Sequence, residues 1–378
     1  MFIELRGVEF VNKGAELMLH AILQEIGREL PKAKFVMKAT GRSPIAKLRK
    51  NNIYIKSDLK RNNLNLEPYL KFVPNFILNA AGIASKSQIN VILDGSGFAF
   101  GDKWGAKKAG FRMADHITKW KNENKKVILL PQAFGPFSKE DIILKMKIIL
   151  ENADLVFARD KVSYDYLTKI KSKDNVFLFP DFTNLIKGDV PSYFNRESHQ
   201  IGIIPNQKMM ETDNEDENNK YLDFLKSVVQ IFQSKNEKPF FLIHESNLDF
   251  KIAKQVNEML DEPIEIIEED NPIAVKGIIG ACKAVVTSRF HGLVSALSQS
   301  IPCLATGWSH KYEMLFRDYN YEEGLCSVND TNKVLDSKIH MLLETNSREG
   351  IIQKLSLNAK EQKSLTKQMW NKAYQVIK

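Results

Sequence analysis

The chain has 378 residues, of which 43% are hydrophobic and 26% charged, and its formal net charge is +8. At roughly 150 residues per domain, this length predicts two domains that can each bury a core. No stretch reaches the roughly 18 apolar residues of a membrane span, and the first residues lack the apolar region of a secretion signal. We therefore expect neither an integral membrane protein nor an exported one. The moderate charge gives no reason to expect nucleic acid as a partner.

The three cysteines are expected to be buried and reduced. Cys282, Cys303 and Cys326 are odd in number, and none stands in CxxC spacing with another. A disulfide scaffold and a structural zinc site both need paired or closely spaced thiols. We expect small buried hydrophobes in a protein of the reducing cytoplasm.

The first half of the chain alternates short apolar strands with amphipathic helices. Apolar side chains recur at helical spacing over residues 12–30, directly after a strand at 2–7. Further strands are predicted at 34–39, 89–95, 126–132, 153–159 and 175–181, and helices at about 111–121 and 141–152. Continuous apolar strands separated by helices are typical of a parallel sheet covered on both faces.

A polar, proline-containing segment at residues 187–200 predicts the domain boundary, because the alternation restarts after it. Strands are expected at 199–206, 239–246, 263–269, 283–288 and 301–306, with helices at 221–234, 249–260, 273–282 and 292–299 and long helices at the end. Residues 209–221 are acidic and poor in apolar side chains, which predicts a flexible loop. The predicted fold class is α/β, with two doubly wound Rossmann-like domains, 1–190 and 200–378, facing a central cleft.

The segment from Arg42 to Ala84 differs in composition from its surroundings. Its first part is rich in Lys and Arg, and its second part, from Tyr69 onward, is apolar and aromatic. Two interpretations stay open for it: a solvated and partly mobile region, or a surface that docks on an anionic membrane.

Polar side chains and glycines follow several predicted strands, at the edge of the sheet where such folds bind ligands. Gly95, Gly97 and Gly101 do not make GxGxxG, so a dinucleotide fingerprint is excluded. Their loop either brings backbone amides close to a ligand or forms a tight turn. Asp94 and Asp181 are candidates for orienting an acceptor, for acting as a base, or for capping a helix.

The sharpest local signal is the turn from the strand at 283–288 into the next helix, which carries Ser288, Arg289 and His291. A cation beside a helix N-terminus makes an anion site, because free amides and the helix dipole both favour negative charge. His310 and Lys311 follow the next strand, so a ligand with more than one negative group is expected. The alternative interpretation is structural: an arginine bound to a carboxylate and a histidine satisfied in the core.

His291 is the candidate general acid. The helix N-terminus disfavours the imidazolium form, whereas a bound multivalent anion favours it. Protonation would then accompany binding of an anionic substrate, which suits a general acid.

Together, these motifs resemble the polysaccharide pyruvyl transferase family. The matching elements span about residues 1–315 in the expected order and are the turn 12–16, the glycine-rich loop 94–102, the runs 131–136 and 158–163, Pro180 with Asp181, the run 288–305 and Lys311. The segment 42–84 and the terminal helices carry no part of the resemblance.

The resemblance implies a GT-B-type enzyme with an acceptor-side N-terminal domain and a donor-side C-terminal domain. Such an enzyme transfers pyruvate from phosphoenolpyruvate onto two hydroxyls of a sugar, in a cell-surface polysaccharide or its precursor, as a cyclic ketal. It implies donor binding by Arg289 and Lys311, catalysis by His291, and a contact of Arg159 with the donor's carboxylate or phosphate. The other expected substrate-binding residues are Ser288, Gly292, Asn12, Gly14, Asp94, Gly95, Gly97, Gln132 and Asp181, and Glu16 joins Asp94 and Asp181 as a candidate base.

The chemistry of the donor agrees with these residue types. Phosphoenolpyruvate carries a carboxylate and a phosphate, and Arg binds either group in bidentate fashion. The reaction demands neither a metal nor a cofactor, and we expect none. The expected partners are phosphoenolpyruvate and a saccharide acceptor, which is lipid-linked in some members of the family and is met at the cytoplasmic face of the membrane.

Two other functions stay open. A nucleotide-sugar-dependent glycosyltransferase of the same architecture would use the acidic run Glu268, Glu269 and Asp270 to hold a ribose, although a solvated loop explains that run equally well. A non-catalytic relative would keep the fold without the chemistry. Against the latter, Arg159, Arg289, His291 and Lys311 are all present.

Overall fold

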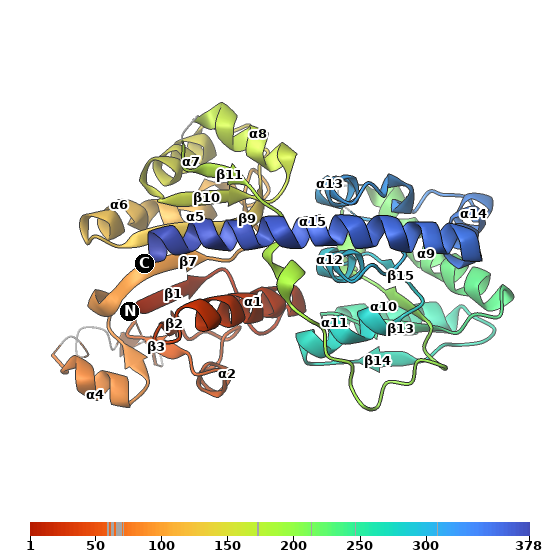
Figure 1. The fold of residues 1–378 in the computed structure, drawn as a ribbon, viewed down its shortest axis with the longest axis horizontal. Helices are drawn as coiled ribbons and strands as arrows, with labels where there is room; N and C mark the ends of the chain where they lie inside the picture. The colour runs from red at the N-terminus through yellow and green to blue at the C-terminus, as the bar shows by residue number, and fades with distance from the viewer. Residues whose placement is uncertain are drawn as a thin grey trace. The chain divides into compact units, whose positions relative to one another are not determined.

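The computed structural model describes residues 1–58, 60, 61, 64, 65, 70, 72–171, 174–212, 214–245, 247–307 and 309–378. The contacts within the chain divide it into two units. Unit 1 comprises Met1–Phe182 with Thr366–Lys378, and unit 2 comprises Thr183–Leu365. The sequence-based division kept residues 200–378 together, whereas these contacts return 366–378 to unit 1. The terminal helix α15 (Thr345–Ile377) therefore contributes residues to both units (Figure 1).

Unit 1 is built on a nine-stranded sheet in the order β11-β10-β9-β7-β1-β2-β3-β6, with β8 paired to β9. Its strands are β1 (Phe2–Arg6), β2 (Lys34–Met37), β3 (Tyr54–Lys56), β6 (Ile83–Ala84), β7 (Ile89–Asp94), β8 (Phe98–Phe100), β9 (Lys126–Phe134), β10 (Leu155–Ala158) and β11 (Val176–Leu178). A separate antiparallel pair joins β4 (Lys60–Arg61) and β5 (Leu64–Asn65). The helical segments are α1 (Lys13–Glu29), α2 (Ile45–Lys50), α4 (Asn75–Ala80), η1 (Lys86–Gln88), α5 (Gly105–Ala109), the π turn η2 (Gly110–Ala114), α6 (Asp115–Asn122), α7 (Glu140–Asn152) and α8 (Lys161–Ile170).

The strand order of unit 1 makes it doubly wound. From β1 the chain proceeds to β2 and β3 in one direction, and from β7 it proceeds to β9, β10 and β11 in the other. All of these neighbours pair in parallel. Because parallel crossovers are right-handed, the helices that link the two halves fall on opposite faces of the sheet. The order reverses between β1 and β7.

Unit 2 repeats this plan with a five-stranded parallel sheet in the order β14-β13-β12-β15-β16 (Figure 1). Its strands are β12 (Ile201–Ile204), β13 (Pro239–Ile243), β14 (Ile266–Glu268), β15 (Ala284–Thr287) and β16 (Cys303–Ala305). Its helical segments are η3 (Phe182–Leu185, from the end of unit 1), η4 (Gln207–Met210), α9 (Glu215–Ser234), α10 (Asn247–Glu258), α11 (Pro272–Ala281), α12 (Phe290–Ser298), α13 (Lys311–Asp318), η5 (Glu322–Gly324) and α14 (Asn332–Leu343). Here the order reverses between β12 and β15.

The predicted fold class is confirmed: both units are doubly wound α/β structures on parallel sheets. The predicted burial of the cysteines is also confirmed, since Cys282, Cys303 and Cys326 are free and buried. No helix in the described part of the chain has the length and apolar character that a membrane crossing requires.

The flexible loop predicted at residues 209–221 is wrong. Helix α9 begins at Glu215, and the side chain of Asn214 accepts a hydrogen bond from the Glu217 amide. The acidic composition that suggested a loop is the composition of a first helical turn, where carboxylates interact favourably with the dipole. Asp213 lies outside the described residues.

The described part of the segment 42–84 has regular secondary structure, and its docking on a membrane stays a prediction. Residues within it form α2 and α4, and β3 and β6 extend the main sheet. These strands have only three and two residues, too short for an alternating pattern to be recognised. Residues 59, 62, 63, 66–69 and 71 of this segment, Tyr69 among them, lie outside the described residues.

Candidate functional site

The candidate residues of unit 2 lie where its strand order reverses. The Ser288 amide donates to the carbonyl of Ile204 at 2.9 Å, which joins the ends of β15 and β12. The Ser288 carbonyl accepts from Asn206 Nδ2 at 2.7 Å and from the Tyr312 hydroxyl at 2.8 Å. The Tyr221 hydroxyl donates to Ser288 Oγ at 2.9 Å. Ser288 is thus fixed by four elements, which holds the loop after β15 in one position.

Arg289 is held by two carboxylates. Its Nε lies 3.0 Å from Asp249 Oδ2, its Nη2 lies 2.6 Å from both oxygens of Asp249, and its Nη1 pairs with Glu245. Asp249 is fully buried, whereas 20% of the Glu245 side chain is exposed. Burial raises the pKa of Asp249 and lowers that of Arg289, so each charge depends on the other. The carboxylate contact that the structural alternative predicted for Arg289 is present, and donor binding by this residue stays a proposal.

Two helix N-termini meet beside this loop. Arg289 occupies the position before α12 and His310 the position before α13, so His291 and Lys311 lie in the first turns of their helices. Lys311 Nζ lies 5.1 Å from the centre of the Phe290 ring, and the rings of Phe290 and His291 meet edge to face at 5.6 Å. The first turn of α12 has no acidic residue, although acidic residues are favoured there. A bound anion would interact favourably with such an arrangement.

Gly292 has a packing reason for being glycine. A Cβ built on it would lie 2.6 Å from Thr287 Oγ1. That hydroxyl accepts a hydrogen bond from the Arg289 amide at 3.0 Å. The glycine therefore permits the tight turn that places Arg289 and His291, and its expected contact with substrate stays a prediction.

In unit 1 the structure brings four of the predicted residues together along the carboxyl ends of neighbouring strands. Gln132 Nε2 donates to Asp94 Oδ1 at 3.2 Å, and Arg159 Nη1 donates to Asp181 Oδ2 at 3.1 Å. The Arg159 amide donates to the Gln132 carbonyl at 3.0 Å, which links the two pairs. All four are at most 5% exposed, so these side chains form a buried polar network.

The remaining predicted residues of unit 1 surround its own strand reversal. Asn12 caps α1, because its Oδ1 accepts from the Ala15 amide at 3.0 Å, and Gly14 is buried in the first turn of that helix. The Gly95 amide donates to the Arg6 carbonyl at 2.8 Å, and the Gly97 carbonyl accepts from Ala133 at 3.0 Å. The glycine-rich loop therefore forms a tight, hydrogen-bonded turn into β8, a strand that the sequence analysis missed.

Asp249, Glu245, Asn206 and Tyr221 were not singled out from the sequence. Asn206 and Glu245 stand in loops that follow β12 and β13, so position after a strand was an available signal. Asp249 lies inside α10, and nothing in its local pattern distinguishes it from a surface carboxylate. Within the described ranges, no group of three or more His, Cys, Asp or Glu residues is placed to hold a metal ion.

The fold and these edge loops define a protein of the GT-B type. HepE of Anabaena, solved with UDP-glucose, has a TM-score of 0.62 at 12% identity, covering 99% of this chain and 100% of HepE. The UDP-GlcNAc 2-epimerase of Neisseria meningitidis, solved with UDP-GlcNAc, has a TM-score of 0.58 at 12% identity, covering 94% of this chain and 93% of the epimerase. Comparison with curated proteins finds no match in sequence.

The model of one family, polysaccharide pyruvyl transferase, matches residues 12–310, which is most of the chain. The chain therefore belongs to the polysaccharide pyruvyl transferase family, as the motifs predicted. The match includes the loops of both units described above and the N-terminal turn of α12.

The Arg289 ion pairs lead to a stability prediction. We expect Asp249→Asn to lower the free energy of unfolding by about 3 kcal/mol, because a buried guanidinium loses its main partner. Glu245→Gln is the matched control and should cost less than about 1 kcal/mol, since that carboxylate is partly solvated. Urea unfolding of both variants measures the difference. Equal losses would show that the two carboxylates hold Arg289 equally.

Proposed function

We propose that this protein transfers pyruvate from phosphoenolpyruvate onto two hydroxyls of a saccharide, as a cyclic ketal. The observation that carries the proposal is the family match over residues 12–310, which contains every element of the candidate site except Lys311. Further support comes from unit 2, where Lys311, the first residue of α13, lies 5.1 Å from the ring of Phe290, the first residue of α12 and the neighbour of Arg289 in sequence. The reaction needs phosphoenolpyruvate as donor substrate and no resident cofactor.

The chemistry assigns a proton donor and an anion clamp. His291 protonates C3 of the donor, which leaves an oxocarbenium-like centre at C2. A first sugar hydroxyl forms a bond to C2 and gives up its proton to a base. The bond from C2 to the phosphate oxygen then breaks, inorganic phosphate leaves, and the second hydroxyl closes the ketal with loss of its proton. Asp94, Asp181 and Glu16 remain the candidate bases, and all three are at most 5% exposed.

The pairing of Arg289 refines its role in donor binding. Asp249 engages Nε and Nη2 from a fully buried position, so this contact orients the guanidinium. Glu245 engages Nη1 from a partly exposed position. We infer that a carboxylate or phosphate of the donor replaces Glu245 as the partner of Arg289 Nη1. The donor then also binds Lys311, the second cation of the site. Asp249 is then a positioning residue, and Glu245 competes with the donor.

Donor binding follows from this exchange. At about 100 times its dissociation constant, phosphoenolpyruvate should stabilise the protein by about 2.7 kcal/mol in a thermal-shift titration. Glu245→Gln should bind phosphoenolpyruvate about tenfold more tightly because it removes the competing carboxylate, and Lys311→Ala should bind it less tightly because it removes a cation. Weaker binding by Glu245→Gln would contradict the exchange.

The same titration separates the other functions. The structural neighbours include proteins solved with UDP-sugars, which favours a nucleotide-sugar-dependent glycosyltransferase as second candidate. The acidic run that suggested ribose binding is partly engaged locally, because Glu269 accepts from the Tyr193 hydroxyl at 2.7 Å and from the Asn271 amide at 2.8 Å. Stabilisation by UDP and not by phosphoenolpyruvate would support that candidate. Stabilisation by neither would support a non-catalytic relative.

The role of His291 predicts a loss in turnover without a loss in donor binding. We expect His291→Ala to lower the rate of phosphate release from phosphoenolpyruvate in the presence of acceptor by about 10² to 10⁴-fold, the usual effect of a lost general acid. His340→Ala is the matched control, because His340 is exposed on α14. Unchanged turnover in His291→Ala would assign protonation to another group.

We also propose that the segment holding α2 and α4 contacts an anionic membrane surface, where a lipid-linked acceptor would be met. Phe72, Phe76 and Ile77 are 88%, 74% and 48% exposed, which is unusual for large apolar side chains close together in sequence. Helix α2 carries Lys47, Arg49 and Lys50. Helix α2 contacts β3, α4 contacts β6, and β3 pairs with β6, so both helices belong to the same end of the sheet. This combination is typical of interfacial binding.

Liposome flotation tests this surface. The protein should float with vesicles that contain anionic lipid, less so at high salt, and Phe72→Ser with Phe76→Ser should abolish most of the binding. Leu357→Ser is the control, since Leu357 is 70% exposed on α15. No flotation with either neutral or anionic vesicles would remove the proposal.

A further inference from the structure

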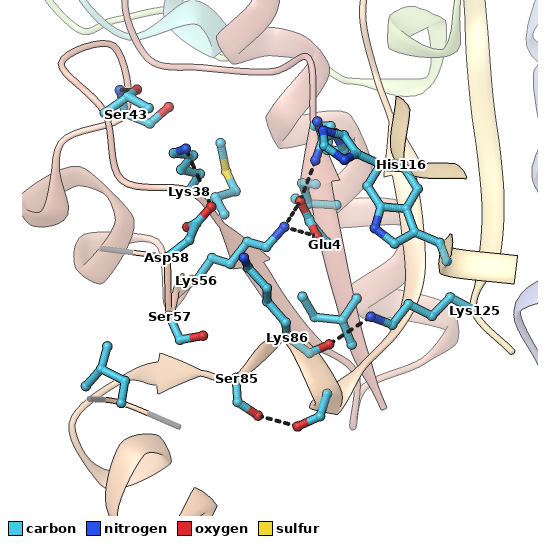
Figure 2. Close-up of a pocket in the computed structure, with 18 of the residues that line it drawn as sticks. Glu4, Lys38, Ser43, Lys56, Ser57, Asp58, Ser85, Lys86, His116 and Lys125 are labelled. Atoms are coloured by element: carbon cyan, nitrogen blue, oxygen red, sulfur yellow. Dashed lines mark hydrogen bonds and ion pairs between the residues drawn. The ribbon is translucent and has the colours of Figure 1, made fainter. Parts of the chain in front are cut away.

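A pocket of about 1280 Å³ lies within unit 1. It borders the glycine-rich loop, because its lining residue Arg112 donates a hydrogen bond to Ser96 Oγ. It is lined by β1, β2 and β3 and by η2 and α6 (Figure 2). Glu4 and Arg6 are two residues apart on β1 and therefore face the same side of the sheet. The Arg6 guanidinium lies 5.1 Å above the Trp120 ring of α6, which identifies this side as the face that α6 covers.

A buried ionic cluster forms the inner wall of this pocket. Lys56 Nζ lies 2.6 Å from both oxygens of Glu4 (Figure 2). Arg6 Nη1 lies 2.9 Å from Glu4 Oε1. Glu4 is 3% exposed and Lys56 is 7% exposed. Buried ion pairs contribute little net stability because desolvation offsets their attraction. Two cations also exceed what one carboxylate neutralises, so the cluster keeps a positive charge that stability alone does not require.

The pocket as a whole is cationic. Its lining has nine Lys and Arg side chains and four carboxylates, Glu4, Glu9, Asp58 and Glu123. A fifth carboxylate, Asp94, lies just outside the lining and pairs with Arg112 at 3.6 Å. An excess of four positive charges remains, which is half of the protein's net +8. Burial and the neighbouring Arg112 and Arg42 lower the pKa of Lys108, and burial and Arg6 lower that of His116. These cations repel one another, and a bound anion would relieve the repulsion.

Aromatic side chains complete the lining. The rings of His116 and Trp120 lie 5.5 Å apart along α6. Phe111 and Phe72, also in the lining, are 70% and 88% exposed. Basic side chains and exposed rings in one lining suit a ligand with an anionic end and a less polar body. A multivalent anion attached to a sugar ring fits both halves of this lining.

We propose that this pocket binds a saccharide that carries a phosphate group, with the phosphate among the basic side chains of the lining, which include Arg6, Lys56 and Lys108, and the sugar ring against the exposed Phe111. This saccharide is the acceptor of pyruvyl transfer, an assignment that rests on the function proposed above. A phosphate carries up to two negative charges, so it matches the charge excess better than the single charge of a uronate does.

Isothermal titration of the full chain with a panel of hexose 1-phosphates tests the site. Inorganic phosphate, the free hexoses, glucuronate and UDP are the comparison ligands. At least one hexose 1-phosphate should bind more tightly than inorganic phosphate and than any free hexose, and its affinity should fall with ionic strength. The pocket assignment is overturned if inorganic phosphate binds as tightly as every sugar phosphate, or if glucuronate or UDP binds more tightly.

Variants locate the binding. Lys108→Ala should weaken binding of the hexose 1-phosphate about tenfold, and Phe111→Ala should remove the advantage of the hexose 1-phosphate over inorganic phosphate. Lys107→Ala is the matched control, because Lys107 is exposed and does not line the pocket. Lys56→Met should abolish binding, and Lys108→Ala keeps the test valid if Lys56→Met fails to fold. Equal affinity in Lys108→Ala and the parent would place the ligand elsewhere.

Two failures can be told apart in the same experiment. Lys311→Ala in unit 2 should weaken the binding of phosphoenolpyruvate and leave the binding of the hexose 1-phosphate unchanged. Lys108→Ala should weaken the binding of the hexose 1-phosphate and leave that of phosphoenolpyruvate unchanged. Sugar-phosphate binding that follows the pocket variants, without any binding of phosphoenolpyruvate, would keep the site and reject pyruvyl transfer. Phosphoenolpyruvate binding that depends on Lys311, without any sugar-phosphate binding, would reject the pocket and keep the donor site.

Discussion

Parallel strand pairing is the constraint on which both units depend, because it gathers the carboxyl ends of all strands of a sheet at one edge. In each unit the strand order also reverses once, between β1 and β7 and between β12 and β15. The connections on either side of a reversal leave in opposite directions, so the loops there are not covered by the next helix. In unit 2 these loops carry Asn206, Ser288 and Arg289, and in unit 1 they carry Asn12 and Gly95.

Chain segments approach each other closely at these reversals, and this close approach requires glycine at particular positions. Gly7 follows β1 with φ +80°, and a Cβ on it would lie 2.2 Å from Ser96 Oγ in the loop after β7. In unit 2, Gly292 in the first turn of α12 packs against Thr287 at the end of β15. Each glycine permits a close approach just after a strand, so the polar side chains beside it keep one orientation. Preorganisation of this kind is what a clamp for a multivalent anion requires.

The sequence predicted elements well where one pattern was long and unopposed. Helix α1 is an example: seven apolar positions at helical spacing follow a capping Asn12, and the observed helix runs from Lys13 to Glu29. Predictions failed where the signal was short or had two physical causes. The strands β3 and β6 are too short to show a period, and the acidic start of α9 has the composition of a loop as well as that of a first helical turn.

The candidate residues were predictable to the extent that they follow strands, whereas their partners were not. Ser288 and Arg289 stand directly after β15 and Asp94 is the last residue of β7, and the structure brings each to an edge as expected. Asp249 reaches Arg289 across 40 positions of sequence, from inside a helix. Lys56 reaches Glu4 across 52 positions. A charged residue within an apolar strand such as β1 was an available sign of an unusual environment, but the identity of its partner depends on the register of β2 and β3, which a single sequence does not determine.

The two ionic clusters have opposite charge balance, and this difference decides how each can meet an anion. Around Arg289, one cation faces the two carboxylates of Asp249 and Glu245, so an anion gains a place only when the partly exposed Glu245 leaves. Around Glu4, one carboxylate faces the two cations Lys56 and Arg6, so an anion can be added without displacing a protein group. At Arg289 an anion must replace Glu245, so this site selects anions that interact with the guanidinium better than the tethered carboxylate does. Near Glu4 an anion binds in addition to the existing ion pairs and is attracted mainly at long range. Anion affinity near Glu4 should therefore fall more steeply with salt than anion affinity at Arg289.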